Sequence, residues 1–517
     1  GDRVAAILPN FGETVISFLA TAQIGAIWSS CSPDFGKQAI IDRFKQIEPK
    51  ILFVTDYYFY NKKKFDTTLI IPNILEYIPS ITDVVIIPYD KIKTENEIKF
   101  KYTEWYEILQ SNKLYDKFEK FSFNHPLYIL YSSGTTGVPK CIVHGAGGSL
   151  IQHKKEHQIH CNINENDKVF YYTTCGWMMW NWLVSSLASK ATIVLYDGSP
   201  FIPDKKNLFE IANKEQIKFF GTGAKYLDTL RNFEININDH FDLKYLKVIA
   251  STGSPLVNET FNYVYNSIKK DVLLASISGG TDIVSCFILG NPSLPVFSGE
   301  IQCAGLGMDI DIFDENGKSI NLQKGELVCK TPFPSKPLYF WNDKNFQIYN
   351  KSYFSKFPNI WCHGDYCIKT DNNGYMILGR SDATLNSGGV RVGTAEIYRV
   401  IENIEEICEA LAVEYIKKND TEVILFVVTH DNVSFNNNLK EKLNYRIRNE
   451  LSPKHVPAEI YPVLEIPKTR SGKIVEILVK NLINGEEIVN LDILINPDCL
   501  KEYVEIYKTL KKKCRIE

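Results

Sequence analysis

The stretch Ser132-Ser133-Gly134-Thr135-Thr136-Gly137-Val138-Pro139-Lys140 follows directly on the apolar run 127–130. Its glycines let backbone N–H groups approach an anion, its hydroxyls add donors, and Lys140 brings a mobile positive charge to the same oxygens. The spacing G-x-x-G-x-x-K differs from the G-x-x-x-x-G-K-[ST] of the Walker loop. The stretch therefore predicts a turn that binds nucleotide phosphates outside the P-loop fold, with an ordinary surface turn as the alternative.

Short β-rich runs alternate with amphipathic segments through the first two thirds of the chain. Strands are expected at residues 4–8, 51–54, 84–87, 192–196, 218–220, 248–250 and 272–275, and helices at 13–24 and 261–269. Strands separated by helices predict parallel α/β layers. From about residue 297 the pattern changes to short strands and Asn-Gly turns, which predicts a small β-rich subdomain.

The pattern changes again after Gly379-Arg380-Ser381-Asp382. An expected helix at 395–411, a strand at 423–428 and a helix at 438–451 predict a compact α+β unit. We therefore place a domain boundary at Asp382, with a large N-terminal domain at 1–381 and a small C-terminal domain at 382–517. The chain begins at Gly1 within a strand-like run and without an initiator methionine, so a further segment is expected upstream.

Composition and charge argue against several classes of protein. The chain has 517 residues, too many for a single core, and its net charge of -3 gives no reason to expect nucleic acid as a partner. No apolar run reaches the roughly 18 residues that cross a bilayer, and the N-terminus lacks the pattern of a signal peptide. The twelve cysteines include no C-x-x-C pair, so reduced, buried thiols are expected. A cytoplasmic protein without membrane insertion is predicted.

Seven segments occur in an order that is highly specific when they are taken together: 132–140, 251–255, 278–282, 363–365, 379–382, 388–391 and 467–473. In these motifs, and over nearly its whole length, the chain resembles the adenylate-forming superfamily of acyl-CoA synthetases, luciferases and peptide-synthetase adenylation domains. The resemblance implies an α/β fold: a large AMP-binding domain of layered α/β subdomains with a small β-rich subdomain, followed by a small mobile α+β domain. It also implies ATP, Mg²⁺ and coenzyme A as ligands.

Within that superfamily, further segments are similar to the acetoacetyl-CoA synthetase family: 28–36, 176–181, 278–287, 382–386 and 496–500. This resemblance implies a ligase that adenylates acetoacetate and transfers the acyl group to coenzyme A, giving acetoacetyl-CoA, AMP and pyrophosphate. Members carry a further N-terminal segment, in agreement with the segment expected upstream of Gly1. Two alternatives stay open: an acetyl- or propionyl-CoA synthetase, and a truncated, non-catalytic nucleotide-binding remnant.

Attack of a carboxylate on the α-phosphorus of ATP brings two anions together, so cations and fixed dipoles are needed at that point. By resemblance, Lys473 bridges the acyl carboxylate and the α-phosphate, and Thr281 and Arg391 contact the α-phosphate. Asp365 accepts the ribose hydroxyls, and Arg380 is directed at the ribose or a phosphate. The other nucleotide contacts that the resemblance implies are Ser132, Ser133, Gly134, Thr135, Thr136, Gly137, Lys140, Gly253, Ser254, Pro255, Gly279 and Gly280.

The resemblance also implies a metal ligand and a hinge. Asp282 stands where the superfamily usually has a glutamate, and its carboxylate can serve Mg²⁺; capping of a following helix is the alternative. For the thioester-forming step, members rotate the small domain about the residue that matches Asp382. The implied coenzyme A contacts are Gly388 and Gly389 at the pantetheine tunnel and Arg448, or alternatively Arg446, at a phosphate.

Acyl specificity is expected from an apolar wall that carries one amide: Trp177, Met178, Met179, Trp180 and Asn181. Without the resemblance, such an aromatic cluster would more often be core than pocket. Our hypothesis is that Asn181 donates a hydrogen bond to the 3-keto oxygen of acetoacetate. A site built to pair a polar group rejects analogues that lack it far better than an apolar slot does.

A rival function is suggested by His153-Lys154-Lys155-Glu156-His157, which fits the inverted H-x-x-E-H pattern of zinc proteases. Two histidines four residues apart share one face of a helix, and His160 and Cys161 follow closely. The pattern has only three fixed positions, so chance matches are common, and no further carboxylate motif follows. Zinc hydrolysis therefore remains a minor alternative.

Overall fold

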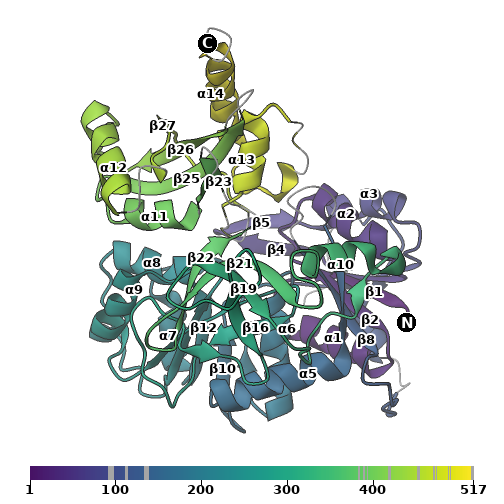
Figure 1. The fold of residues 1–517 in the computed structure, drawn as a ribbon. Coiled ribbons are helices and arrows are strands. Elements are labelled where there is room, and N and C mark those ends of the chain that lie inside the picture. The colour runs from purple at the N-terminus through teal and green to yellow at the C-terminus, as the bar shows by residue number, and fades with distance from the viewer. Residues whose placement is uncertain are drawn as a thin grey trace.

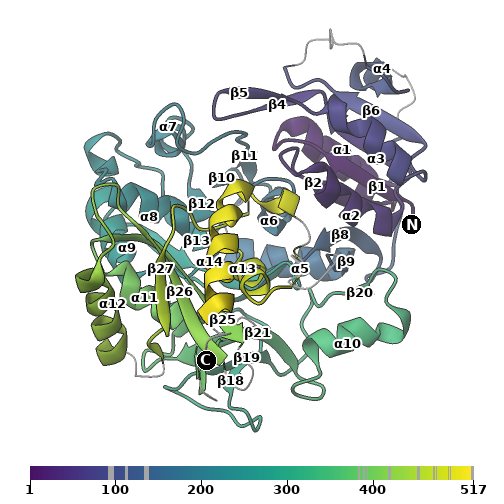
Figure 2. The same ribbon diagram turned by 90° about the horizontal axis from the view of Figure 1, so that it is seen from above.

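The computed structural model describes residues 1–517 except for 91–97, 111–114, 133–138, 382–384, 388–389, 393, 417–420, 451–454, 470–471, 473, 487, 489–490 and 514–517. The described elements form two large sheets, a group of small sheets beside them, and a separate C-terminal lobe above (Figure 1). Seen from above, the C-terminal lobe lies over the second sheet, and the N-terminal sheet lies to its side (Figure 2).

The first sheet has the strand order β20-β9-β8-β2-β1-β3-β6-β7. Its first six strands along the chain pair in parallel, whereas β9 and β20 are antiparallel to their neighbours. Helices cover both faces, which explains why strands such as β1 are buried along almost their whole length. The strands are β1 (Arg3–Ile7), β2 (Ile27–Cys31), β3 (Ile51–Thr55), β6 (Asp83–Ile87), β7 (Thr103–Glu104), β8 (Pro126–Tyr131), β9 (Cys141–Gly145) and β20 (Tyr339–Phe340). The helices here are α1 (Gly12–Gln23), α2 (Lys37–Ile47), α3 (Ile71–Tyr77) and α4 (Trp105–Gln110), and β4 (Tyr57–Tyr60) and β5 (Lys63–Asp66) form a hairpin.

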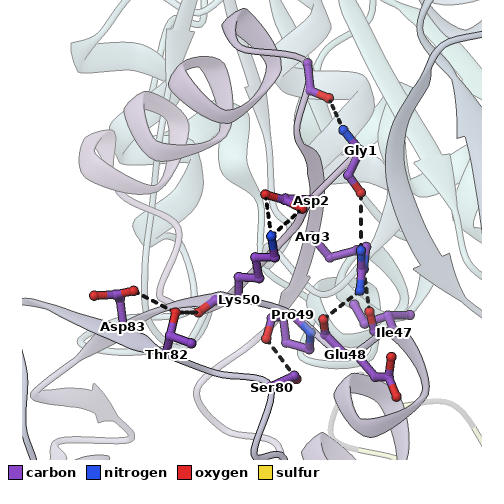
Figure 3. Close-up of polar contacts among 11 residues, drawn as sticks. Gly1, Asp2, Arg3, Ile47, Glu48, Pro49, Lys50, Ser80, Thr82 and Asp83 are labelled. Atoms are coloured by element: carbon purple, nitrogen blue, oxygen red, sulfur yellow. Dashed lines mark hydrogen bonds and ion pairs between the residues drawn. The ribbon is translucent and has the colours of Figure 1, made fainter.

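Polar contacts fix the start of the first sheet (Figure 3). The side chain of Arg3 donates to the carbonyl oxygens of Ile47 and Glu48, at 2.6 and 2.9 Å, and so ties β1 to the end of α2. Lys50 and Asp2 form an ion pair at 2.9 Å, but both side chains are more than half exposed. Such a pair contributes at most about 1 kcal/mol, so the guanidinium contacts of Arg3 are the firmer anchor.

The second sheet is entirely parallel, in the order β11-β10-β12-β13-β14. One apolar core joins both sheets through a central helix, because Trp28 of the first sheet, Trp180 of α6 and Phe219 of the second belong to the same buried cluster. The strands are β10 (Lys168–Tyr171), β11 (Thr192–Val194), β12 (Phe219–Gly223), β13 (Val248–Thr252) and β14 (Leu273–Ser276). The helices are α5 (Ala146–Lys155), which continues as the π-helical segment Glu156–His160, then α6 (Met178–Ser185), α7 (Asn207–Lys214), α8 (Ala224–Asn232) and α9 (Asn258–Tyr263), which continues as the π-helical segment Val264–Ile268.

The predicted β-rich subdomain is confirmed. It has a three-stranded sheet, β15-β16-β17, and a four-stranded antiparallel sheet, β18-β19-β21-β22. The strands are β15 (Ser278–Gly280), β16 (Ser285–Leu289), β17 (Cys303–Ala304), β18 (Ile310–Phe313), β19 (Gly325–Cys329), β21 (Trp361–Lys369) and β22 (Tyr375–Arg380), with α10 (Gln347–Tyr353) beside them.

The C-terminal lobe is the expected α+β unit, but one predicted element is partly wrong. The expected helix at 395–411 ends early, as α11 (Thr394–Glu402), and β25 (Ile407–Ile416) follows because this segment pairs along its length with β26. The other elements are β23 (Leu385–Ser387), β24 (Val390–Val392), β26 (Thr421–Thr429), α12 (Asn437–Glu450), β27 (Glu459–Pro462), α13 (Glu476–Ile483) and α14 (Leu500–Lys513). The predicted boundary, Asp382, lies outside the described residues, between β22 and β23.

Two expectations from composition can be compared with the structure. The cysteines of the described part are free thiols, and most of them are buried, as expected for reduced side chains in the core. None of the helices described is both long and apolar enough to span a bilayer.

Candidate active site

A backbone hydrogen bond joins the two ends of the predicted phosphate turn. Ser132 follows β8 and Lys140 precedes β9, and the backbone N–H of Ser132 donates to the carbonyl oxygen of Lys140 at 3.3 Å. The ammonium of Lys140 donates to the hydroxyl of Ser352 on α10 at 2.9 Å. The hydroxyl of Ser132 is enclosed and has no hydrogen-bond partner within the described ranges. The predicted contacts between them lie outside the described residues: Ser133, Gly134, Thr135, Thr136 and Gly137.

The next residue of α10 reaches the predicted metal ligand. The hydroxyl of Tyr353 donates to Oδ1 of Asp282 at 2.5 Å, and the Tyr353 ring stacks on Trp361 with ring centroids 3.7 Å apart. Neighbouring residues of one helix, Ser352 and Tyr353, therefore contact Lys140 and Asp282. This short helix brings the predicted phosphate-binding lysine and the predicted metal ligand to the same place.

Asp282 lies with Thr281 in the tight turn that joins β15 to β16. The alternative role, capping a helix, is wrong because residues 281–284 lead into a strand. A side chain at Gly279 would collide with the carbonyl oxygen of Ser285, so the close pairing of β15 and β16 requires glycine at this position.

The predicted ribose-binding residues lie directly beside this turn. Asp365 on β21 is buried and pairs in register with Arg380 on β22, which brings these two predicted contacts together at the backbone level. Nε2 of His363 lies 3.5 Å from Oδ2 of Asp365. A Cβ added at Gly280 would lie 3.3 Å from the His363 ring. The turn that carries Thr281 and Asp282 therefore lies next to β21, with His363 between them.

The sequence reasoning named neither His363 nor His144 as a site residue. His363 stands in the quoted motif His363-Gly364-Asp365, so a signal for it was present. His144 on β9 is almost fully buried, and burial lowers its pKa to about 3, although the charge of nearby Asp282 acts in the opposite direction. A neutral imidazole thus lies against the Thr281–Asp282 turn. No local pattern marks it, because its neighbours come from distant parts of the chain.

Two of the predicted groups meet at the end of β13. Gly253 has a φ of 95°, and a Cβ at this position would lie 3.8 Å from the Trp177 ring, so the nucleotide turn and the acyl wall adjoin. Ser254 and Pro255 are exposed at the same turn.

The predicted acyl wall contains buried core side chains and one buried amide that has no hydrogen-bond partner among the described residues. Trp180 is fully buried, stacks on Trp28 and donates through Nε1 to Asn10 at 3.1 Å, so its ring helps to hold the two sheets together. Met178 and Met179 are also buried. Asn181 is 1% exposed, yet neither amide atom has a hydrogen-bond partner in the described part of the chain. A buried, unpaired amide is costly and requires a partner.

Among the predicted coenzyme A contacts, the structure describes Arg448 and its alternative, Arg446, both in the small lobe. Arg448 is exposed on α12, and this helix lies at the outer edge of the small lobe (Figure 1). Arg446, the alternative, is partly buried on the same helix. Arg391, which is predicted to contact the α-phosphate, lies on β24, where its backbone pairs with Asn386. Gly388, Gly389, Asp382 and Lys473 lie outside the described residues, so their roles stay predictions.

An ion pair joins the two lobes. Glu409 on β25 lies 3.4 Å from Lys225 on α8 of the large domain, and it also accepts a hydrogen bond from Lys468. Lys468 belongs to the segment 467–473 that ends in the predicted catalytic lysine. Because α11 also packs against β22, the small lobe lies over this strand of the β-rich subdomain.

The contacts made by the H-x-x-E-H residues do not fit a zinc protease. His153 contacts Ser185 and the carbonyl oxygen of Val284, and Glu156 is fully buried and accepts from Gln152 and Trp182. Among the described residues, no group of three or more His, Cys, Asp and Glu is arranged to hold a metal ion. An open hollow of about 460 Å³ lies elsewhere, between Lys330, Asn350 and Trp361, and none of the predicted site residues lines it.

Comparisons with known proteins identify the family and the fold. Residues 1–339 match the family model of the AMP-binding enzyme, and residues 396–473 match that of the AMP-binding enzyme C-terminal domain. A solved anthranilate CoA ligase in complex with anthranoyl-AMP has a TM-score of 0.75 at 18% identity, covering 92% of this chain and 86% of its own, and so supports the fold alone. Fold and site together define an adenylate-forming, AMP-binding enzyme.

More similar relatives narrow this class. The chain is 50% identical over 504 residues to acetoacetyl-coenzyme A synthetase of Rhizobium meliloti (strain 1021), covering 97% of this chain and 77% of that one. It is 46% identical to acetoacetyl-CoA synthetase of Danio rerio, covering 99% and 76%. The solved acetoacetyl-CoA synthetase from Streptomyces lividans has a TM-score of 0.91 at 39% identity, covering 98% and 78%. The chain belongs to the acetoacetyl-CoA synthetase family.

Proposed function

We propose that this chain is an ATP-dependent ligase that joins acetoacetate to coenzyme A. In the first step a carboxylate oxygen of acetoacetate bonds to the α-phosphorus of ATP and pyrophosphate leaves. In the second, the thiolate of coenzyme A bonds to the acyl carbon and AMP leaves. The observation that carries the proposal is 50% identity over 97% of the chain to a named acetoacetyl-CoA synthetase.

The geometry of the large domain supports the first step. Lys140 contacts Ser352 and Asp282 contacts Tyr353, which are consecutive residues of α10, and Thr281 precedes Asp282 in the β15–β16 turn. Positive groups fixed near the α- and β-phosphates lower the barrier because charge develops there in the transition state. We assign Lys140 to the outer phosphates, and Thr281 with Arg391 and Lys473 to the α-phosphate.

Asp282 fits a magnesium ion. Its carboxylate offers the hard oxygen ligand that Mg²⁺ prefers, and Tyr353 orients that carboxylate by donating to Oδ1. When bound, the ion would neutralise charge on the phosphate oxygens. The ribose would be held by Asp365 on the adjoining strand.

Asn181 supports acetoacetate as the acid. Its buried amide offers both a donor and an acceptor without a partner inside the described part of the chain. A keto oxygen three carbons along the acid would pair with the donor, whereas the methylene of butyrate would leave it unpaired.

A panel of carboxylates tests the proposal. Acetoacetate, acetate, propionate and butyrate would each be supplied with ATP, Mg²⁺ and coenzyme A, and both AMP release and thioester formation would be measured. We expect the highest kcat/KM with acetoacetate. Preference for acetate or propionate would replace the assigned substrate, and the absence of ATP–pyrophosphate exchange with every acid would favour a non-catalytic remnant.

A further inference from the structure

The motif that suggested zinc chemistry has a different place in the structure. His153 near the end of α5 and Glu156 in the π-helical segment lie one helical turn apart, and both are completely buried. Each of them contacts two elements: α6, which carries Asn181, and the end of the turn that carries Thr281 and Asp282. We call these two side chains and their partners the buried bridge.

His153 makes both contacts through its ring nitrogens. Nε2 lies 2.5 Å from the carbonyl oxygen of Val284, and Nδ1 lies 2.8 Å from the hydroxyl of Ser185 on α6. A carbonyl oxygen can only accept, so Nε2 carries the hydrogen. Burial lowers the pKa of His153, which leaves the ring neutral and Nδ1 free to accept from Ser185. That hydroxyl has a single hydrogen, which it donates either to Nδ1 or to the carbonyl oxygen of Asn181, 2.8 Å away.

Glu156 repeats the pattern one turn later. Its Oε2 accepts from Nε1 of Trp182 on α6 at 2.8 Å. Its Oε1 accepts from the hydroxyl of Ser285 and lies 3.4 Å from the backbone nitrogen of Cys286. Two consecutive turns of one helix thus hold α6 on one side and residues 284–286 on the other.

The turn held in this way is strained. Val284 is a β-branched residue with a φ of 48°, in the left-handed region that such residues rarely adopt. Backbone in this state persists only where the surroundings enforce it. Here the Val284 carbonyl is bound by His153, and the two following residues are bound by Glu156. The position of Thr281 and Asp282, three and two residues earlier, therefore depends on these contacts.

We propose that His153 and Glu156 are positioning residues that fix the acyl-binding helix α6 relative to the Thr281–Asp282 turn. This inference rests on the proposed function of the site. Attack on the α-phosphorus needs the carboxylate and the phosphate in register, and α6 and the turn carry the predicted contacts to each. The buried bridge links these two elements directly through polar contacts.

Two substitutions of His153 separate its two contacts. The amide nitrogen of glutamine reaches about as far as Nε2, so His153→Gln keeps the bond to Val284 and loses Ser185. The amide of asparagine reaches about as far as Nδ1, so His153→Asn keeps Ser185 and loses Val284. Two milder variants isolate the same arms: Ser185→Ala removes the contact to α6, and Ser285→Ala removes the hydroxyl bound by Glu156.

The experiment measures kcat and the KM for acetoacetate in ATP–pyrophosphate exchange with the full chain. His153→Asn and Ser285→Ala should lower kcat, by about 10-fold or more for His153→Asn, with the KM for acetoacetate nearly unchanged, because the turn is displaced. His153→Gln and Ser185→Ala should raise the KM for acetoacetate about 5-fold with kcat largely kept, because α6 is freed.

His160→Asn is the matched control. His160 lies in the same π-helical segment, is 2% exposed, and pairs through Nδ1 with the Gly290 carbonyl and through Nε2 with the Leu306 N–H, away from α6 and the turn. It should lower the melting temperature while leaving both kinetic constants within about 2-fold.

The possible outcomes are distinct. The inference is supported if kcat falls in His153→Asn and Ser285→Ala while the KM for acetoacetate rises in His153→Gln and Ser185→Ala. If all four variants instead behave like His160→Asn, with a lower melting temperature but unchanged kcat and KM, the buried bridge is only structural and the inference is wrong. If His153→Asn fails to fold, Ser185→Ala and Ser285→Ala still decide the question. An inactive wild-type chain would overturn the proposed function, and the inference with it.

Discussion

Under the proposed function, Asn181 is the residue that distinguishes acetoacetate from acids without a keto oxygen. Replacing it with alanine removes the buried amide, so the cost of leaving that amide unpaired beside an apolar acid disappears together with the bond to the keto oxygen. We expect Asn181→Ala to lower the acetoacetate-to-butyrate ratio of kcat/KM by about 10-fold or more. Competition between the two acids in one assay measures the ratio directly. A ratio equal to that of the wild type would remove Asn181 from the acyl pocket.

Tyr353 donates a hydrogen bond to Asp282, the residue that we propose as a magnesium ligand. Tyr353→Phe keeps the stacking on Trp361 but no longer orients Asp282, so about 10-fold more Mg²⁺ should be needed for half-maximal ATP–pyrophosphate exchange. The matched control is Tyr349→Phe, one turn earlier on α10, where the hydroxyl donates to the Pro337 carbonyl instead. Equal Mg²⁺ requirements in the two variants would contradict the assignment of Asp282 as a metal ligand.

The free energy of unfolding should depend on pH through His157, which lies in the π-helical segment after α5. Burial holds the pKa of His157 well below its usual range. Below the ordinary histidine pKa of about 6.5, the unfolded chain binds a proton that the folded chain excludes, so the free energy of unfolding falls as the pH is lowered. His157→Phe keeps an aromatic ring against Trp182 and removes this titration.

The expected change for His157→Phe is a shallower pH dependence, by up to about 1.4 kcal/mol per pH unit below the ordinary histidine pKa. Urea unfolding followed by tryptophan fluorescence at about pH 7 and about pH 5 measures the slope. Parallel slopes in variant and wild type would show that His157 titrates alike in both states.

Elements with a clear period could be predicted from the sequence, whereas those decided by distant partners could not. The strands expected at 4–8, 51–54 and 248–250 correspond to β1, β3 and β13, because each is a short apolar run covered on both faces. The segment 407–416 contains good helix formers but becomes β25, because pairing with β26 overrides that preference.

The residues of the candidate site also fall into those that the sequence indicated and those that only the fold reveals. The local pattern of the Gly/Ser/Thr turn indicated Lys140, and the family resemblance implied Asp282 and Asp365. The contacts that support them come from far along the chain: Ser352 lies 212 residues beyond Lys140, and Tyr353 lies 71 residues beyond Asp282. Neither side chain stands in a recognisable pattern, so only the fold reveals them.

At the scale of the whole molecule, the two chemical steps should depend differently on the small lobe. If Lys473 neutralises charge in adenylation only, Lys473→Ala should lower ATP-driven thioester formation by about 100-fold or more. The variant should still convert preformed acetoacetyl-adenylate and coenzyme A at a nearly normal rate. Lys468→Ala, which changes a lysine of the same segment that binds Glu409, is the control and should lose far less. Equal loss of both steps in Lys473→Ala would contradict the separation.

The last strand of the N-terminal sheet has a consequence for synthesis. β20 closes the sheet beside β9, although its residues, Tyr339–Phe340, follow β9 by almost two hundred positions. Until the ribosome has released them, the edge of β9 stays open, and exposed edges invite pairing with other chains. Because α10 begins soon after β20, the nascent chain covers this edge and delivers Ser352 and Tyr353 almost together. Nucleotide-binding competence should therefore arise late in translation, as the nascent sheet loses its exposed border.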